Sequence, residues 1–155
     1  MTTEGYILYR SGFKHQLAED YKINGLIKPE SNIETEFIDL DIYGLLTIRE
    51  GYAWDGPSGP VIDTDENLRG SLVHDARYQL MRMDLLDLKI HRKAADQEFQ
   101  KICKEDGVSS FRTFIWYRGL RRFGKFAADP KNKKVILRAP LEIEIDNFKS
   151  NVVST

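Results

Sequence analysis

Ten residues near the middle of the chain limit its fold most strongly. Positions 51–60 read Gly-Tyr-Ala-Trp-Asp-Gly-Pro-Ser-Gly-Pro, with three glycines and two prolines. Proline breaks the interior of a helix and cannot pair within a central strand, so neither element can pass through this segment. We therefore predict a loop here, with a different kind of structure on each side of it.

The part before the loop is predicted to form strands, because apolar and polar residues alternate there and turn residues separate the runs. The expected strands cover 6–10, 15–23, 37–42 and 45–49. A turn at Tyr43-Gly44 joins the last two, which indicates a small antiparallel meander.

The part after the loop is predicted to be helical, because its apolar residues recur every three or four positions. The expected helices cover 66–83, 85–105 and a stretch from Ser109 or Ser110 through 126. Strand-like alternation returns at 135–145. This order predicts an α+β fold: a small antiparallel β-meander, the Gly/Pro-rich loop, three α-helices and a C-terminal strand.

Residues at the expected helix ends support these boundaries. Asp63, Thr64 and Asp65 carry side chains that cap helix N-termini, and Asp65 also places negative charge at the positive end of the helix dipole. Asp106-Gly107 is a typical C-terminal stop for the second helix.

The composition agrees with one globular domain over residues 1–155. The chain has 155 residues, of which 41% are hydrophobic and 30% charged, and these values exclude a disordered or collagen-like protein. Cys103 is the single cysteine, so an internal disulfide is excluded. The apolar run at 6–9 is too short for a signal peptide or a transmembrane segment, and we expect neither.

Four residues in the loop and the first two helices are candidates for chemistry. Asp55 follows Trp54 in the loop, and loops on a rigid scaffold often carry catalytic groups. His74 and Asp75 lie in the middle of the first helix, 100° apart around its axis. Asp96 lies in the second helix, at the expected rim of its apolar stripe.

One interpretation of this set is a metal site. Asp55, His74 and Asp96 could hold zinc with one position open for water, or another divalent metal. His74, Asp75 and Asp96 would then be the catalytic groups of a hydrolase. A metal-free alternative uses Asp75 or Asp96 to orient His74 as a general base. The structural alternative is a buried polar network.

Three motifs in this region resemble a known family. They are Gly51-Tyr52-Ala53-Trp54-Asp55 with a later Pro60, His74-Asp75-Ala76-Arg77-Tyr78, and Arg92-Lys93-Ala94-Ala95-Asp96 with Phe99. The chain resembles, over about residues 37–124, the uncharacterised phage and prophage family named domain of unknown function 1353. Trp54 and the run Gly56-Pro57-Ser58-Gly59 depart from that family's pattern, whereas Asp55 keeps its place. The resemblance implies a phage or prophage origin and leaves the activity open.

The region 109–145, which holds the third helix and the last strand, is basic. Between Phe111 and Lys134 there are eight lysines and arginines, one acid and six aromatic residues. This combination is typical of nucleic-acid binding or of a helix on an anionic membrane, and an anionic ligand is expected. The alternative is a core helix whose aromatic residues are buried. Net charge runs from −8 over residues 1–66 to +6 over residues 112–155.

Three functional hypotheses follow, and whether the chain is an enzyme stays open among them. The first is a phage-encoded metal-dependent hydrolase acting on a cell-wall peptide or a nucleotide. The second is a non-catalytic virion or tail component, or a host-interaction protein. The third is a protein that sequesters a phosphorylated ligand in a pocket lined by Trp54, Tyr78, Arg92 and Arg118. The expected location is the host cytoplasm or the virion, and the expected partner is a substrate or a phage or host protein.

Overall fold

A computed structural model describes residues 7–9, 13–56, 64–132 and 137–139. The chain divides into two compact units, one of residues 13–133 and one of the two chain ends, 1–12 and 134–155. In the unit of the chain ends, β1 (Ile7–Tyr9) pairs antiparallel with β8 (Leu137–Ala139). Of the strands predicted over 135–145 and 6–10, the parts at 137–139 and 7–9 are therefore present and pair with each other, and the rest of both lies outside the described residues.

The larger unit contains a four-stranded antiparallel sheet. Its strands, in spatial order, are β3 (Tyr21–Asn24), β6 (Leu45–Ile48), β5 (Ile38–Leu40) and β4 (Ile33–Glu34). Alternate residues of β5 and β6 are buried, as expected for strands with one covered face. The fold class is α+β, and the predicted meander between 37 and 49 is confirmed.

The turn between β5 and β6 follows from two residues. Asp41 Oδ1 accepts hydrogen bonds from the backbone amides of Tyr43 (2.9 Å) and Leu45 (2.8 Å). Gly44 has a φ of 95°, which side-chain-bearing residues rarely adopt. These interactions fix the register in which Ile38 pairs with Ile48 and Leu40 with Leu46.

The single strand predicted over 15–23 is wrong, because this stretch is interrupted. It consists of β2 (His15–Gln16) and β3, with residues 17–20 between them. β2 pairs with β7 (Ala53–Trp54), which lies inside the segment predicted to be a loop. The pairing is allowed because both prolines of that segment come later, at 57 and 60. Residues 57–63, with Asp63, lie outside the described residues.

Helices α1 (Asp65–Arg82), α2 (Leu88–Glu105) and α3 (Ser110–Phe123) confirm the three predicted helices. Thr64 caps α1, and its backbone amide donates to Asn67 Oδ1 (3.1 Å). α2 begins later than predicted because Asp87 is its cap, accepting from the amides of Lys89 and Ile90.

The third predicted helix is interrupted at Gly124. Beyond it lie a short helix, α4 (Lys125–Ala128), and a 3₁₀ turn, η1 (Pro130–Asn132). A Cβ at Gly124 would lie 2.6 Å from the hydroxyl of Tyr78. Glycine therefore allows the end of α3 to approach α1 closely.

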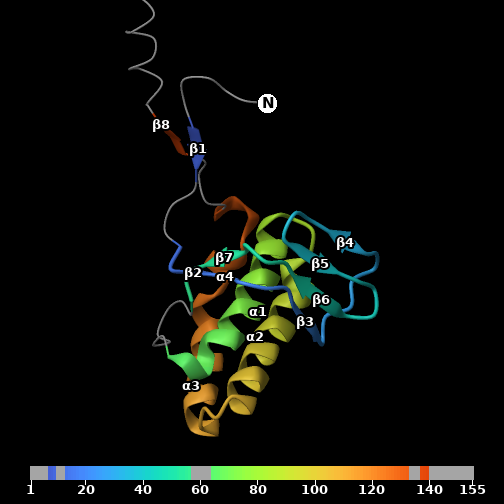
Figure 1. Cartoon of the computed structure of the whole chain (residues 1–155). Helices are drawn as coiled ribbons and strands as arrows, with labels where there is room; N and C mark the ends of the chain where they lie inside the picture. Colours follow the sequence, from blue (N-terminus) through green and yellow to red (C-terminus); the bar gives the residue numbers. More distant parts are fainter. Residues whose placement is uncertain (1–6, 10–12, 57–63, 133–136, 140–155) are drawn as a thin grey trace, which may run out of the picture. The chain divides into compact units, whose positions relative to one another are not determined.

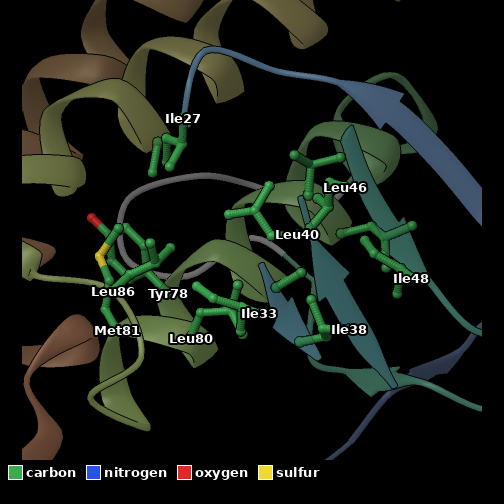
Figure 2. Close-up of a cluster of buried hydrophobic side chains, with 14 of the residues drawn as sticks. Ile27, Ile33, Ile38, Leu40, Leu46, Ile48, Tyr78, Leu80, Met81 and Leu86 are labelled. Atoms are coloured by element: carbon green, nitrogen blue, oxygen red, sulfur yellow. The ribbon is translucent and has the colours of Figure 1, made fainter. Parts of the chain in front are cut away.

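Helix α1 is the central element of the larger unit (Figure 1). Its Leu80 and Met81 join sheet residues such as Ile38 and Ile48 in the main hydrophobic core (Figure 2). A second buried cluster, formed by Phe99, Cys103, Val108, Trp116 and Leu120, packs α2 against α3. α1 is thus covered on more than one side, and this covering encloses His74.

A buried ion pair attaches the sheet to the helices. Arg77 Nε donates to Glu98 Oε2 (3.0 Å), and Glu98 Oε1 accepts from the backbone amide of Leu26. A Cβ at Gly25 would lie 2.0 Å from that oxygen, so only glycine fits beneath the pair. The end of β3 is therefore held against α2 by a charged pair that the sequence motifs did not indicate.

Candidate functional site

The adjacent residues His74 and Asp75 contact different partners. They lie about 100° apart around α1, and that separation directs them to two clusters of polar residues. His74 faces α2, whereas Asp75 contacts Tyr52, just before β7. The two must therefore be considered separately.

His74 belongs to a cluster that also contains Tyr78, Arg92, Asp96 and Arg121, called here the Asp96 cluster. Asp96 Oδ1 accepts hydrogen bonds from His74 Nε2 (2.9 Å) and from the hydroxyl of Tyr78 (2.7 Å). Asp96 Oδ2 accepts from Arg121 Nη1 (2.9 Å). One carboxylate thus joins α1, α2 and α3.

Asp96 lies in the core and not at its rim. Its side chain is 0% exposed, and Arg92, one turn earlier, is 9% exposed. Arg92 donates to the carbonyl oxygens of Leu120 (3.0 Å) and Arg121 (3.2 Å), the last turn of α3. The predicted rim position is wrong because α3 covers that side of α2.

The cluster stabilises the ionised form of Asp96. Burial raises the pKa of Asp96, but the hydrogen bond and charge of His74, with hydrogen bonds from Tyr78 and Arg121, outweigh it and lower the pKa below its usual value. Burial, followed by the charge of Asp96, raises the pKa of Tyr78. The pair is therefore an anionic carboxylate and a neutral phenol.

Aromatic contacts fix the imidazole of His74. Its ring centroid lies 4.0 Å from that of Tyr78 and 5.4 Å from that of Phe99, the latter in an edge-to-face arrangement. These contacts and the Asp96 hydrogen bond hold the ring in one orientation.

Asp75 forms the second cluster, on another side of α1. Its Oδ2 accepts from the hydroxyl of Tyr52 (2.6 Å), and Arg82 lies 3.7 Å from Oδ1. Burial, then the charge and hydrogen bond of Asp75, raise the pKa of Tyr52, and the charge of Asp55 adds to this. His74 is thus paired with Asp96, and the hypothesis that Asp75 orients it is wrong.

The predicted metal set is not brought together. Among the residues that the structure describes, no three His, Cys, Asp or Glu side chains are placed to hold one metal ion. The charge of Asp55 raises the pKa of Tyr52, in the Asp75 cluster, whereas His74 and Asp96 lie in the other cluster. The chemistry that His74 and Asp96 share is proton sharing and charge pairing.

The four residues predicted to line a ligand pocket lie in different surroundings. Trp54 is buried, and its Nε1 donates to Ser71 Oγ (3.1 Å). Tyr78 and Arg92 belong to the Asp96 cluster, where their polar groups contact protein atoms. Arg118 is exposed on α3. These four side chains do not converge on one ligand.

A small pocket lies elsewhere, between β3 and α2. Its volume is about 190 Å³, and its lining includes Asn24, Gly25, Glu98, Lys101 and Glu105. Ligand sites commonly have about 300–1,000 Å³. None of its lining residues belongs to the Asp96 cluster, so this pocket does not give that cluster access to a substrate.

Cys103 is a packing residue in the second buried cluster. It is 0% exposed, and burial raises the pKa of its thiol to about 12. The thiolate needed for nucleophilic attack is therefore suppressed near neutral pH.

Sequence reasoning missed Arg121, the partner of Asp96 in one cluster, and Tyr52, the partner of Asp75 in the other. Arg121 lies 25 residues after Asp96, and Tyr52 lies 23 residues before Asp75. The run Arg121-Arg122 in the basic region was visible in the sequence, but its contact with Asp96 depends on how α3 packs.

The alternative of a core helix whose aromatic residues are buried is wrong for most of these residues. Trp116 is buried and Tyr117 is half-buried. The exposed aromatic residues of this region are Phe111, Phe114, Phe123 and Phe126. The region therefore presents a surface rather than only a core face.

Comparison with models of known families, with curated proteins and with solved structures found no match. Within the described residues, no helix combines the length and hydropathy that a bilayer span requires.

Proposed function

We propose that this chain is a non-catalytic interaction protein, in which the Asp96 cluster locks three helices together and α3 presents a binding surface. The observation that carries the proposal is that protein donors already occupy most of the hydrogen-bond acceptor positions of the Asp96 carboxylate. A carboxylate has about four acceptor positions, and hydrogen bonds from His74, Tyr78 and Arg121 occupy three of them. Little capacity is left for a substrate or a metal.

The interactions of Arg92 support the same role. Its guanidinium bonds to the final carbonyl oxygens of α3 and lies 3.9 Å from Asp96. These contacts satisfy helix-end groups that would otherwise be buried without partners. The cluster therefore serves to fix the position and the end of α3.

The resemblance to the phage family supplies the setting in which this proposal is framed. In a phage, an interaction protein of this kind would be a virion or tail component or a factor that acts on the host. Co-purification of the protein with phage particles is the measurement that separates these two settings.

Replacement of Asp96 tests the structural role. Asp96→Asn removes the buried charge that Arg121 and His74 face, and removing one partner of a buried pair costs about 3–5 kcal/mol. We expect a loss of this size in the free energy of unfolding, measured by urea denaturation with circular dichroism. Glu105→Gln, at an exposed ion pair on the same helix, is the control and should cost less than about 1 kcal/mol.

A hydrolase is the second candidate, and the contact between His74 and Asp96 is the observation that favours it. Asp96 binds Nε2, and Nδ1 is then the nitrogen that would take a proton, as in a general base oriented by a carboxylate. In that case Asp96→Asn would keep or raise stability. The wild type would also cleave a cell-wall peptide or a nucleotide, and His74→Gln would not. Metal analysis of the purified protein would test the divalent-metal form of this candidate.

A further inference from the structure

The outer face of α3 carries large apolar and basic side chains together. Phe111, Phe114 and Ile115 are 73%, 53% and 47% exposed. Arg118 and Arg122 are exposed further along the helix. We call these five residues the α3 face.

The helical repeat places the α3 face opposite the core. At 100° per residue, its members fall within an arc of about 100°. The buried residues Thr113, Trp116 and Leu120 lie on the other side of the helix. α3 therefore has a packed side and an apolar, basic side that points outward. Phe123, the last residue of α3, and Phe126, in α4, are also exposed.

Such a face is unusual on a surface helix. The solvent side of a helix is normally polar, and a contiguous exposed apolar patch marks an interaction site. No acidic residue occurs between Ser110 and Ala128, whereas Arg112, Arg118, Arg121, Arg122 and Lys125 lie in this stretch. Arg121 is engaged with Asp96, so the remaining basic residues define the charge of the outer side.

We propose that the α3 face binds a membrane surface that contains anionic lipid. This deepens the proposed function by naming the partner of the same surface. Basic side chains pair with lipid phosphate while apolar side chains enter the boundary of the acyl region. The absence of acids from Ser110 to Ala128 removes the charge repulsion that such a surface would otherwise cause.

One contact favours lipid over a single-stranded nucleic acid. The guanidinium of Arg122 lies 5.8 Å from the ring centre of the exposed Phe123, over a ring face on which a base would stack. Trp116 is buried, so its ring offers no stacking surface. Ile115, which lies at one edge of the face and is 47% exposed, offers no ring at all. Insertion into the acyl region of a membrane would bury both the aromatic and the aliphatic side chains of the face, whereas base stacking would use only the aromatic ones.

Vesicle co-sedimentation of the full chain tests the proposal. We expect binding to phosphatidylcholine vesicles that contain phosphatidylglycerol, and weaker binding to phosphatidylcholine alone or at high salt. Each basic residue near an anionic surface contributes about fivefold to affinity, so the double variant Arg118→Glu, Arg122→Glu should bind at least about tenfold more weakly. Phe114→Ser with Ile115→Ser should also weaken binding.

Matched changes in the N-terminal half of the larger unit, away from α3, supply the controls. Lys22→Glu with Lys28→Glu makes the same charge change at exposed positions, and Ile42→Ser with Tyr43→Ser removes exposed apolar groups. Both should leave vesicle binding within about twofold of wild type.

Three results would overturn the lipid proposal. They are equal vesicle binding by the α3-face variants, tighter binding to a single-stranded oligonucleotide than to vesicles, and salt-dependent self-association through the α3 face in sedimentation velocity. None of them bears on the structural role of Asp96, which is tested separately by the unfolding measurement on Asp96→Asn. The two proposals can therefore fail separately.

Discussion

At the scale of single residues, the Asp96 cluster shows how a buried charge can hold a fold together. Burial raises the pKa of the carboxyl, but the hydrogen bond and charge of His74, with hydrogen bonds from Tyr78 and Arg121, lower it below its usual value. A group with a lowered pKa stabilises the fold above its unfolded pKa, about 3.9 for aspartate, and the stabilisation is lost as pH falls further. The cluster is therefore a source of acid sensitivity.

Tyr78 gives the opposite sensitivity, at alkaline pH. Its pKa is raised in the folded protein, so the unfolded chain loses the phenolic proton first, near pH 10. The stabilisation is complete below about pH 10 and falls as pH rises further. In urea titrations, Tyr78→Phe should lower stability near neutral pH by about 1.5–3 kcal/mol, because Asp96 loses a donor.

The same variant should lose less stability than wild type between about pH 8 and pH 11, because phenylalanine does not titrate. Tyr43→Phe removes an exposed hydroxyl and serves as the control, with both values unchanged. An alkaline loss equal to that of wild type in Tyr78→Phe would contradict the assignment.

Four residues of the Asp96 cluster could be selected from the sequence, but their partnership could not. Helical spacing placed His74 and Tyr78 on one side of α1 and Asp96 one turn after Arg92. Which helix covers Asp96 depends on the packing of α3, and that packing has no local signature. For this reason Arg121 was missed and Asp96 was assigned to the rim.

At the scale of elements, the helices were predicted closely because caps and long periodic stripes mark them. Thr64 and Ser109 begin their helices where expected. β4 and β7 are only two residues long, too short to show alternation, and pairing with distant strands defines them. At Gly124, where α3 ends, the close approach of Tyr78 is likewise a contact with a residue distant in the sequence.

α1 approaches α2 closely at Gly70. A Cβ there would lie 2.8 Å from Cys103 Sγ and 3.3 Å from Phe99. Overpacking costs about 1–3 kcal/mol, whereas alanine gains about 1 kcal/mol over glycine inside a helix. Gly70→Ala should therefore destabilise the protein by about 1 kcal/mol in thermal or urea unfolding.

Cys103→Ala removes the sulfur and supplies the matched background. In it, Gly70→Ala should raise stability by up to about 1 kcal/mol, since the new methyl group fills the vacated space. Equal effects of Gly70→Ala in both backgrounds would show that the sulfur does not limit the approach of the helices.

At the scale of the whole molecule, acidic and basic residues of the larger unit lie on different elements. Glu30, Glu34 and Glu36 are exposed around β4, whereas Arg118 and Arg122 are exposed on α3. The near-zero net charge of the chain, −1, therefore conceals an acidic sheet and a basic helix within one unit. This separation gives an anionic surface one favoured side from which to bind the protein.

The division into two units makes the independence of residues 13–133 testable. Both buried clusters consist of residues between Ile27 and Ala128, together with partly buried residues from Leu17 onward. Because these clusters supply the apolar burial of the larger unit, a chain of residues 13–133 should unfold cooperatively, with a Tm within about 4 °C of the full chain. Near-UV circular dichroism should retain its aromatic signals.

A chain of residues 18–133, which lacks β2 and so leaves β7 unpaired, is the matched comparison and should melt at a lower temperature. Loss of the near-UV signals from 13–133 would instead show that the chain folds as one domain over residues 1–155.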